Sequence, residues 1–274
     1  MDWTGVTNNP AIGGSGSLTI SRNLTLVAGM TVTNTGAWAG AGSADRTWTT
    51  NGVSLATIAS LDTGSGAYNG FLGSNLDIGT KTFTLRKTGG WVFGTNGYTI
   101  TAGTISITNV SQVITLGASV INCTAWNWVG ATPTLNANTS SIRVTGTGTF
   151  TGAGKTYYDV QLNGTAHTVT GNNTYTSLQF NPAGAQTLTF TGTTQTFASM
   201  SRAGNGVITI VNGSFTKTGA GTVVRLRKIS ISGNTASPTF TFYAIDSVDG
   251  GSNVAWHFER SGSIIPRLMA AGVV

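Results

Sequence analysis

The chain has 274 residues and is charged at only 8% of positions, against about 25% in an ordinary soluble domain. Its net charge of +6 comes from 14 Lys and Arg against 8 Asp and Glu, and the densest basic run is Arg225, Arg227 and Lys228. Nucleic-acid binding calls for a denser basic groove, and crossing a bilayer takes roughly 20 consecutive apolar residues. The sequence offers neither, so we expect no nucleic-acid partner and no membrane insertion.

Short threonine-rich phrases run along nearly the whole chain, and most are closed by Gly or Asn. From the N-terminus, the clearest occupy residues 24–36, 98–110, 167–180 and 185–197. Each alternates an apolar or aromatic residue with Thr, Ser or Asn, which is the pattern of a strand with one buried face. Residues 62–80 are Gly-rich and break this pattern, so we expect an irregular insertion there that protrudes from one corner.

The spacing of these phrases predicts the fold. Neighbouring phrases start roughly nine to twelve residues apart, and a repeat of roughly 20–30 residues with two or three short strands makes one coil of a β-helix. We therefore predict an all-β chain whose residues 1–239 form a single-stranded parallel β-helix, also called a β-solenoid. The alternative is an antiparallel β-sandwich or jelly roll, which also gives many short strands.

The threonine pattern ends near residue 240, and aromatic residues take its place. Residues 240–259 contain Phe240, Phe242, Tyr243, Trp256 and Phe258, with a turn signal at residues 249–251. Because the terminal coil of a solenoid must be capped, we interpret this segment as closing strands that form an aromatic cap.

The last segment, residues 260–274, is an apolar tail. Its residues Ile264, Ile265, Leu268 and Met269 are predicted assembly contacts, because four such side chains have little reason to be solvated together. A solenoid with few charges gains stability when closed symmetry hides its sides. We expect a homo-oligomer, most simply a trimer; a frayed terminus is the other interpretation of the tail.

Three motifs of the chain resemble one group of known sequences. The first two are GAGKTYYDVQLNG at residues 152–164 and TVTGNNTYTSLQF at 168–180, and the third is DGGSNVAWHF at 249–258. The residues that carry the resemblance are Gly152, Gly154, Thr156, Tyr157, Tyr158, Val160, Leu162, Asn163, Gly164, Val169, Gly171, Asn173, Thr174, Tyr175, Asp249, Gly250, Gly251, Asn253, Trp256 and Phe258. Together they resemble Thr/Gly-rich β-helical proteins of tailed phages and environmental bacteria, which are tail-fibre-like or hypothetical structural proteins.

The resemblance implies a structural protein of a tailed-phage virion: a fibre, an appendage or a capsid-decorating protein. Its implied location is the virion, and its implied partners are other virion proteins. Members of the group tend to have further strands before the segment that corresponds to residues 3–8, so either this chain starts late or an N-terminal part, with any attachment domain in it, is missing. The alternative is a bacterial surface adhesin or carbohydrate-binding module at the cell surface, and a polysaccharide-degrading tailspike ranks third.

Contact with host surface polysaccharide would need side chains suited to sugars. Trp126 and Trp128 alternate on one strand face, where aromatic rings can stack on sugar rings. Cleavage of a polysaccharide would need paired carboxylates. The candidates are Asp246 with Asp249, or Asp62 with Asp77 if the fold stacks them. Both Asp246 and Asp249 also fit a turn, so we expect no enzyme.

Metal and nucleophile signatures are weak. His167 and His257 stand in separate strand phrases, with no second ligand at a metal-binding spacing. The phrase DSVDGGSN lacks the alternating acids of a calcium loop. Cys123 is the only cysteine, and we interpret it as a small buried side chain. We therefore predict no metal and no cofactor.

Overall fold

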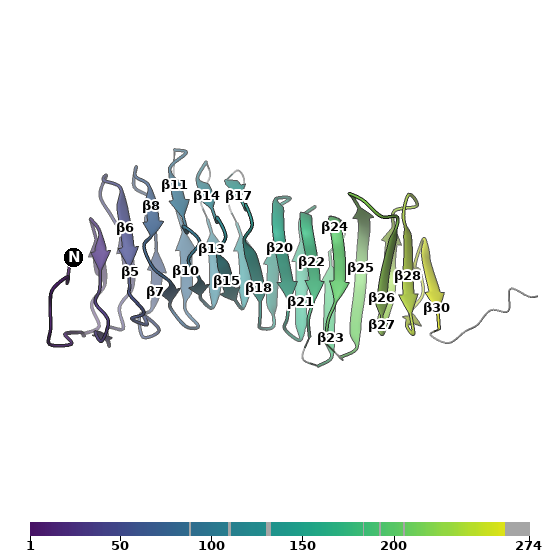
Figure 1. Cartoon of the computed structure of the whole chain (residues 1–274), viewed down its shortest axis with the longest axis horizontal. Coiled ribbons are helices and arrows are strands. Elements are labelled where there is room, and N and C mark those ends of the chain that lie inside the picture. Colours follow the sequence, from purple (N-terminus) through teal and green to yellow (C-terminus); the bar gives the residue numbers. More distant parts are fainter. Residues whose placement is uncertain are drawn as a thin grey trace, which may run out of the picture.

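The computed structural model describes residues 1–260, except for residues 88, 109–110, 130–132, 183, 192 and 205. This part of the chain folds into thirty strands without a helix, and it contains no helix that could cross a membrane. All strand pairs among the described residues are parallel, as in the pairing of β10 (Thr82–Leu85) with β13 (Thr104–Ile107). The strands stack along the long axis of the molecule in about eleven turns (Figure 1). The predicted parallel β-solenoid is confirmed.

Strands of similar position in each coil form four sheets. The two-stranded sheet contains β1 (Ala11–Ile12) and β4 (Thr31–Val32). The six-stranded sheet contains β3 (Leu24–Thr25), β6 (Arg46–Thr49), β8 (Gly70–Leu72), β11 (Val92–Gly94), β14 (Val113–Thr115) and β17 (Thr134–Asn136). The three-stranded sheet contains β26 (Val223–Arg227), β28 (Thr241–Ile245) and β30 (Trp256–Glu259).

The remaining nineteen strands belong to one large sheet that runs along the molecule. They are β2 (Leu18–Ile20), β5 (Trp38–Gly40), β7 (Ser60–Asp62), β9 (Leu76–Asp77), β10 (Thr82–Leu85), β12 (Ile100–Thr101), β13 (Thr104–Ile107), β15 (Val120–Cys123), β16 (Ala125–Trp128), β18 (Ser141–Val144), β19 (Gly148–Thr151), β20 (Thr156–Leu162), β21 (Ala166–Thr170), β22 (Thr174–Phe180), β23 (Gln186–Phe190), β24 (Thr194–Arg202), β25 (Ile208–Lys217), β27 (Ile229–Ala236) and β29 (Val248–Asp249).

Parallel pairing places equivalent residues of successive coils side by side. Thr82 pairs with Thr104, 22 positions further on, and Thr149 pairs with Thr168 after 19 positions. Because paired residues point to the same side of a sheet, inward residues form columns through the interior. One such column is Leu61, Phe83, Ile105, Trp126, Phe150, Val169 and Phe190, all at most 1% exposed.

Buried amide side chains fix the corners of the coils. The side chain of Gln186 donates from Nε2 to the carbonyl oxygens of Leu162 and Gly164 in the preceding coil, both at 2.8 Å. Asn173 Oδ1 accepts from the backbone N–H of Gly154 at 3.1 Å. Corners cannot complete the strand ladder, and a buried unpaired backbone group is costly. These amides therefore supply hydrogen bonds where the strands end.

Residues 62–80 are an integral part of the stack, so the prediction of a protruding insertion is wrong. The segment contributes β8 and β9, which pair with strands of the neighbouring coils, and Tyr68 is fully buried. A Cβ atom on Gly64 would lie 2.0 Å from the carbonyl oxygen of Gly40. The glycines are therefore there because the backbones of successive coils approach closely, whereas their sequence pattern resembles that of a loop.

The aromatic cluster predicted near the C-terminus is present. The ring centroids of Phe242 and Trp256 lie 5.2 Å apart, and Phe197 lies 6.1 Å from Phe242. Strands β28 and β30 pair in parallel, so residues 240–259 continue the stack with one more coil. Asp249 Oδ1 accepts from the backbone N–H of Gly251 at 2.9 Å, which confirms the turn. Ile264, Ile265, Leu268 and Met269 lie outside the described residues.

The inward aromatic column gives a stability prediction. Phe150 is fully buried, and its ring lies 5.1 Å from that of Tyr157 and 6.2 Å from that of Tyr175. We expect Phe150→Ala to lower the free energy of unfolding by about 3–5 kcal/mol, because the coil cannot collapse around the cavity. Urea denaturation followed by circular dichroism measures this. Thr149→Ser on the outward side of the same strand is the control, with an expected change of about 0.5 kcal/mol or less; equal losses in both variants would contradict this packing.

Candidate functional site

The two tryptophans predicted to contact glycans lie in the core. Trp126 is fully buried and Trp128 is 3% exposed. Trp126 Nε1 donates to the hydroxyl of Tyr157 at 3.2 Å, and the two rings meet edge to face. The outward side chains of this strand are those of Ala125 and Asn127. The prediction of glycan contact at Trp126 and Trp128 is therefore wrong, because the larger apolar face of the strand turns inward.

The carboxylates of Asp246 and Asp249 have structural partners. Asp246 has a left-handed backbone (φ 50°), and its carboxylate lies 4.0 Å from the Arg227 guanidinium. Asp249 Oδ1 accepts from Asn253 Nδ2 at 2.6 Å in addition to its bond from Gly251. Asp246 thus lies in a tight turn beside the Arg227 guanidinium. Asp249 accepts hydrogen bonds that stabilise the next turn.

The second pair, Asp62 and Asp77, stands on separate rows of the sheet. Asp62 is next to Ala39 and Thr84, whereas Asp77 is next to Thr101. Asp62 forms an ion pair with Arg86 at 2.8 Å. Asp77 accepts from the Ser54 hydroxyl at 2.8 Å and from the backbone N–H of Gly79 at 2.9 Å. The fold therefore does not stack the two carboxylates on each other.

The titratable residues with metal-binding or nucleophilic character are held apart. His167 is 3% exposed and accepts from the backbone N–H of Gly164 at 3.0 Å; burial lowers the pKa of its imidazole to about 4, so it is neutral at pH 7. His257 packs at the surface against Tyr243. Burial raises the pKa of the Cys123 thiol to about 12, which leaves it protonated. Among the described residues, no three His, Cys, Asp or Glu side chains gather closely enough to hold a metal ion.

A pair of buried cations flanks one tyrosine ring, a feature that we did not predict from the sequence. The Arg46 guanidinium carbon lies 3.5 Å and Lys87 Nζ lies 3.1 Å from the centroid of Tyr68, and each of the three residues is at most 2% exposed. Lys87 Nζ donates to the carbonyl oxygen of Thr63 at 3.0 Å, and Arg46 donates to the carbonyl oxygen of Ile20. Both cations occupy inward positions of the alternating pattern, and this is the signal that sequence analysis could have used.

The most regular exposed feature is the outward side of six neighbouring strands, β10, β13, β16, β19, β21 and β23, which we call the threonine face. Ten of its outward residues carry hydroxyl groups: Thr82, Thr84, Thr104, Ser106, Thr149, Thr151, Thr168, Thr170, Thr187 and Thr189. The other three are Ala125, Asn127 and Ala166, so the face has no charged side chain.

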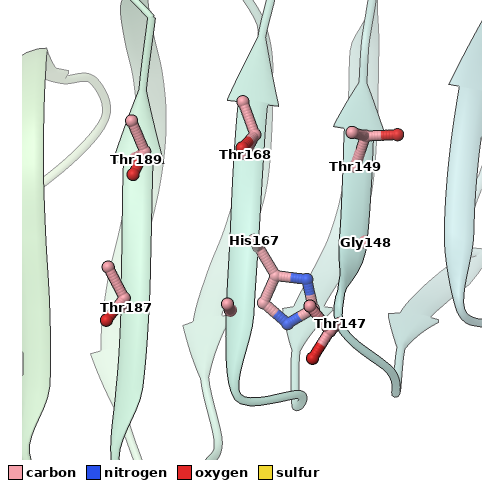
Figure 2. Close-up of a pocket in the computed structure, with 8 residues that line it drawn as sticks. Thr147, Gly148, Thr149, His167, Thr168, Thr187 and Thr189 are labelled. Carbon is pink, nitrogen blue, oxygen red and sulfur yellow. The ribbon is translucent and has the colours of Figure 1, made fainter.

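Strand pairing arranges these residues in straight rows. Thr149, Thr168 and Thr189 are direct neighbours on β19, β21 and β23, and Figure 2 shows them at one height across the three strands. Thr187 lies two residues before Thr189 on the same strand, β23, and below it in Figure 2. Around them is a shallow depression of about 250 Å³. No hydroxyl group of the ten forms a hydrogen bond with another described group of the protein, so all ten are available to a molecule that contacts the face.

Comparison of the chain with protein-family models, with curated proteins and with solved structures finds no significant match.

The buried cations predict how stability depends on pH. Burial and the nearby charge of Arg46 lower the pKa of Lys87 to about 7, whereas an exposed lysine in the unfolded chain has a pKa of about 10.4. Between these values the unfolded chain binds more protons, so we expect the free energy of unfolding to rise as the pH increases from about 7 to about 10. Urea denaturation across this range measures the slope.

Lys87→Met is the matching variant, because it keeps a long apolar side chain and removes the charge. We expect it to unfold at higher urea concentration than the natural chain at pH 7 and to lose most of the slope between pH 7 and 10. Lys155→Met, at a position only half-buried, is the control and should keep the slope. A slope that Lys87→Met leaves unchanged would contradict a buried, easily deprotonated Lys87.

Proposed function

We propose that this chain is a non-catalytic structural protein of a tailed-phage virion, where it forms part of a fibre, an appendage or the capsid decoration. The observation that carries the proposal is the parallel stack of strands along the long axis of the molecule (Figure 1). Columns of buried side chains run from coil to coil inside it. About eleven turns at a strand spacing of about 4.8 Å give a rod about 50 Å long. Such a rod suits a spacer or fibre segment.

The placement of the side chains supports a structural role over the two alternatives. The interpretation as a carbohydrate-binding module or adhesin depended on exposed rings of Trp126 and Trp128, and both are buried in the core. The interpretation as a polysaccharide-degrading tailspike depended on paired carboxylates. Asp249 instead accepts a hydrogen bond within a turn, and Asp62 forms an ion pair with Arg86. The resemblance of residues 152–164 and 249–258 to β-helical phage proteins points the same way. Contact with host polysaccharide through some other surface remains part of the proposal.

Mass spectrometry and electron microscopy of purified virions test the proposal. We expect peptides of this chain in particles of the phage that encodes it, at a constant ratio to the major capsid protein through successive purification steps. Antibodies against the chain should label one defined part of the particle. Particles that contain no such peptides would overturn the proposed function.

We also propose that the chain assembles with itself, as a trimer, and with other virion proteins. Few charges and open strand edges make an isolated solenoid prone to edge pairing, and a closed assembly removes that exposure. Light scattering coupled to size exclusion on the full chain should give three times the 28.0 kDa mass of one chain. A mass of 28.0 kDa at all concentrations would contradict self-association.

A further inference from the structure

The threonine face carries a second inference, independent of the proposed virion role. We propose that this face binds the surface of ice crystals, with crystalline water as its partner. The face is the outward side of β10, β13, β16, β19, β21 and β23, as defined above. Three features support the assignment: the repeat of the array, the hydrogen-bonding state of its hydroxyl groups and the absence of charge.

The first feature is the repeat, which extends in two dimensions. Across the strands, Thr149, Thr168 and Thr189 follow one another at the strand spacing of about 4.7–4.9 Å. Along a strand, Thr168 and Thr170 are two residues apart, which is about 6.6–6.8 Å. The repeat across the strands is close to one repeat of oxygen atoms on a prism face of hexagonal ice, and the repeat along a strand is somewhat shorter than the other. The face therefore presents hydroxyl and methyl groups at intervals that a water lattice can match.

The second feature is that the hydroxyl groups are free, whereas the polar side chains around Asp159, on another wall of the same solenoid, bond one another. On that wall, Asp159 accepts from Ser141 at 2.7 Å, from Gln161 at 2.7 Å and from Gln179 at 2.8 Å. On the threonine face, Thr149, Thr168 and their eight companions bond no protein group. Their donors and acceptors are thus left to water, and the backbone ladder fixes the positions at which they hold it.

The third feature is the absence of charge together with rigidity. A charged side chain would keep its own hydration shell, which does not fit the ice lattice. None of the six strands presents one within the face, and Asp62, which neighbours Thr84 at the edge, is paired with Arg86. Because nine of the outward side chains are β-branched threonines and the strands are locked in register, little conformational freedom is lost when the face meets a solid surface. A sugar ligand is less well matched, since the face lacks the aromatic rings and carboxylates that bind sugars. A second copy of the chain is the competing occupant.

The experiment uses the full chain and a single ice crystal in a nanolitre osmometer. We expect the natural chain to depress the growth temperature of the crystal below its melting temperature, and a fluorescently labelled chain to concentrate on the crystal surface. Thr168→Tyr raises a bulky ring from the centre of the array and should reduce the depression roughly tenfold, because the plane can no longer approach ice. Ser199→Tyr, an exposed residue of β24 on the other wall, is the matched control and should keep the full effect.

Several outcomes would overturn the inference. These are a natural chain that neither depresses growth nor labels the crystal, and a Thr168→Tyr variant as active as the Ser199→Tyr variant. If Thr168→Tyr instead dissociates an oligomer in light scattering and no chain affects ice, the face is an interface between copies. Equal melting temperatures of the two variants show that both keep the fold. Because none of these measurements involves virions, their failure leaves the proposed virion role standing.

Discussion

The parallel backbone ladder between successive coils is the constraint on which the rest of the structure depends. Each residue lies beside its equivalent one coil further on, as Phe150 lies between Trp126 and Val169. A side chain that fits one coil must therefore fit its neighbours, so apolar residues gather in inward columns and threonines in outward rows. Threonine suits the outward rows because its branched Cβ favours extended backbone and its hydroxyl stays hydrated.

The few charged residues of the chain lie outside the threonine face, with Asp62 and Arg86 paired at its edge beside Thr84. Arg46 and Lys87 lie inside, where a tyrosine ring and carbonyl oxygens surround them. Asp249 and Asp77 accept hydrogen bonds from backbone N–H groups in turns. The threonine face is left without charge as a result.

The alternation of Thr with apolar residues predicted the strands, the spacing of the phrases predicted the solenoid, and the loss of the threonine pattern near residue 240 predicted the aromatic cluster near the C-terminus. The alternation separated the two faces of the strand at Trp126 and Trp128, but we assigned the tryptophan face to the outside. The larger apolar side chains on that face were the signal that it turns inward. Glycine misled the prediction for residues 62–80, because Gly64 permits close approach of two coils and also marks loops. The inward positions of Arg46 and Lys87 in the alternating pattern were a signal for the cation site, but the pattern does not identify the carbonyl oxygens of Ile20 and Thr63 that accept from them, because these residues are distant in the sequence.

A single distance tests the parallel register most directly. Five strand steps separate Thr82 from Thr189 along one outward row. Spin labels on the variant Thr82→Cys/Thr189→Cys should therefore give a narrow distribution centred at about 24 Å in pulsed electron paramagnetic resonance. Cys123 is 1% exposed and should not react with the label. A broad distribution, or a distance that differs by more than the reach of the labels, would contradict the stacked coils from which every other conclusion follows.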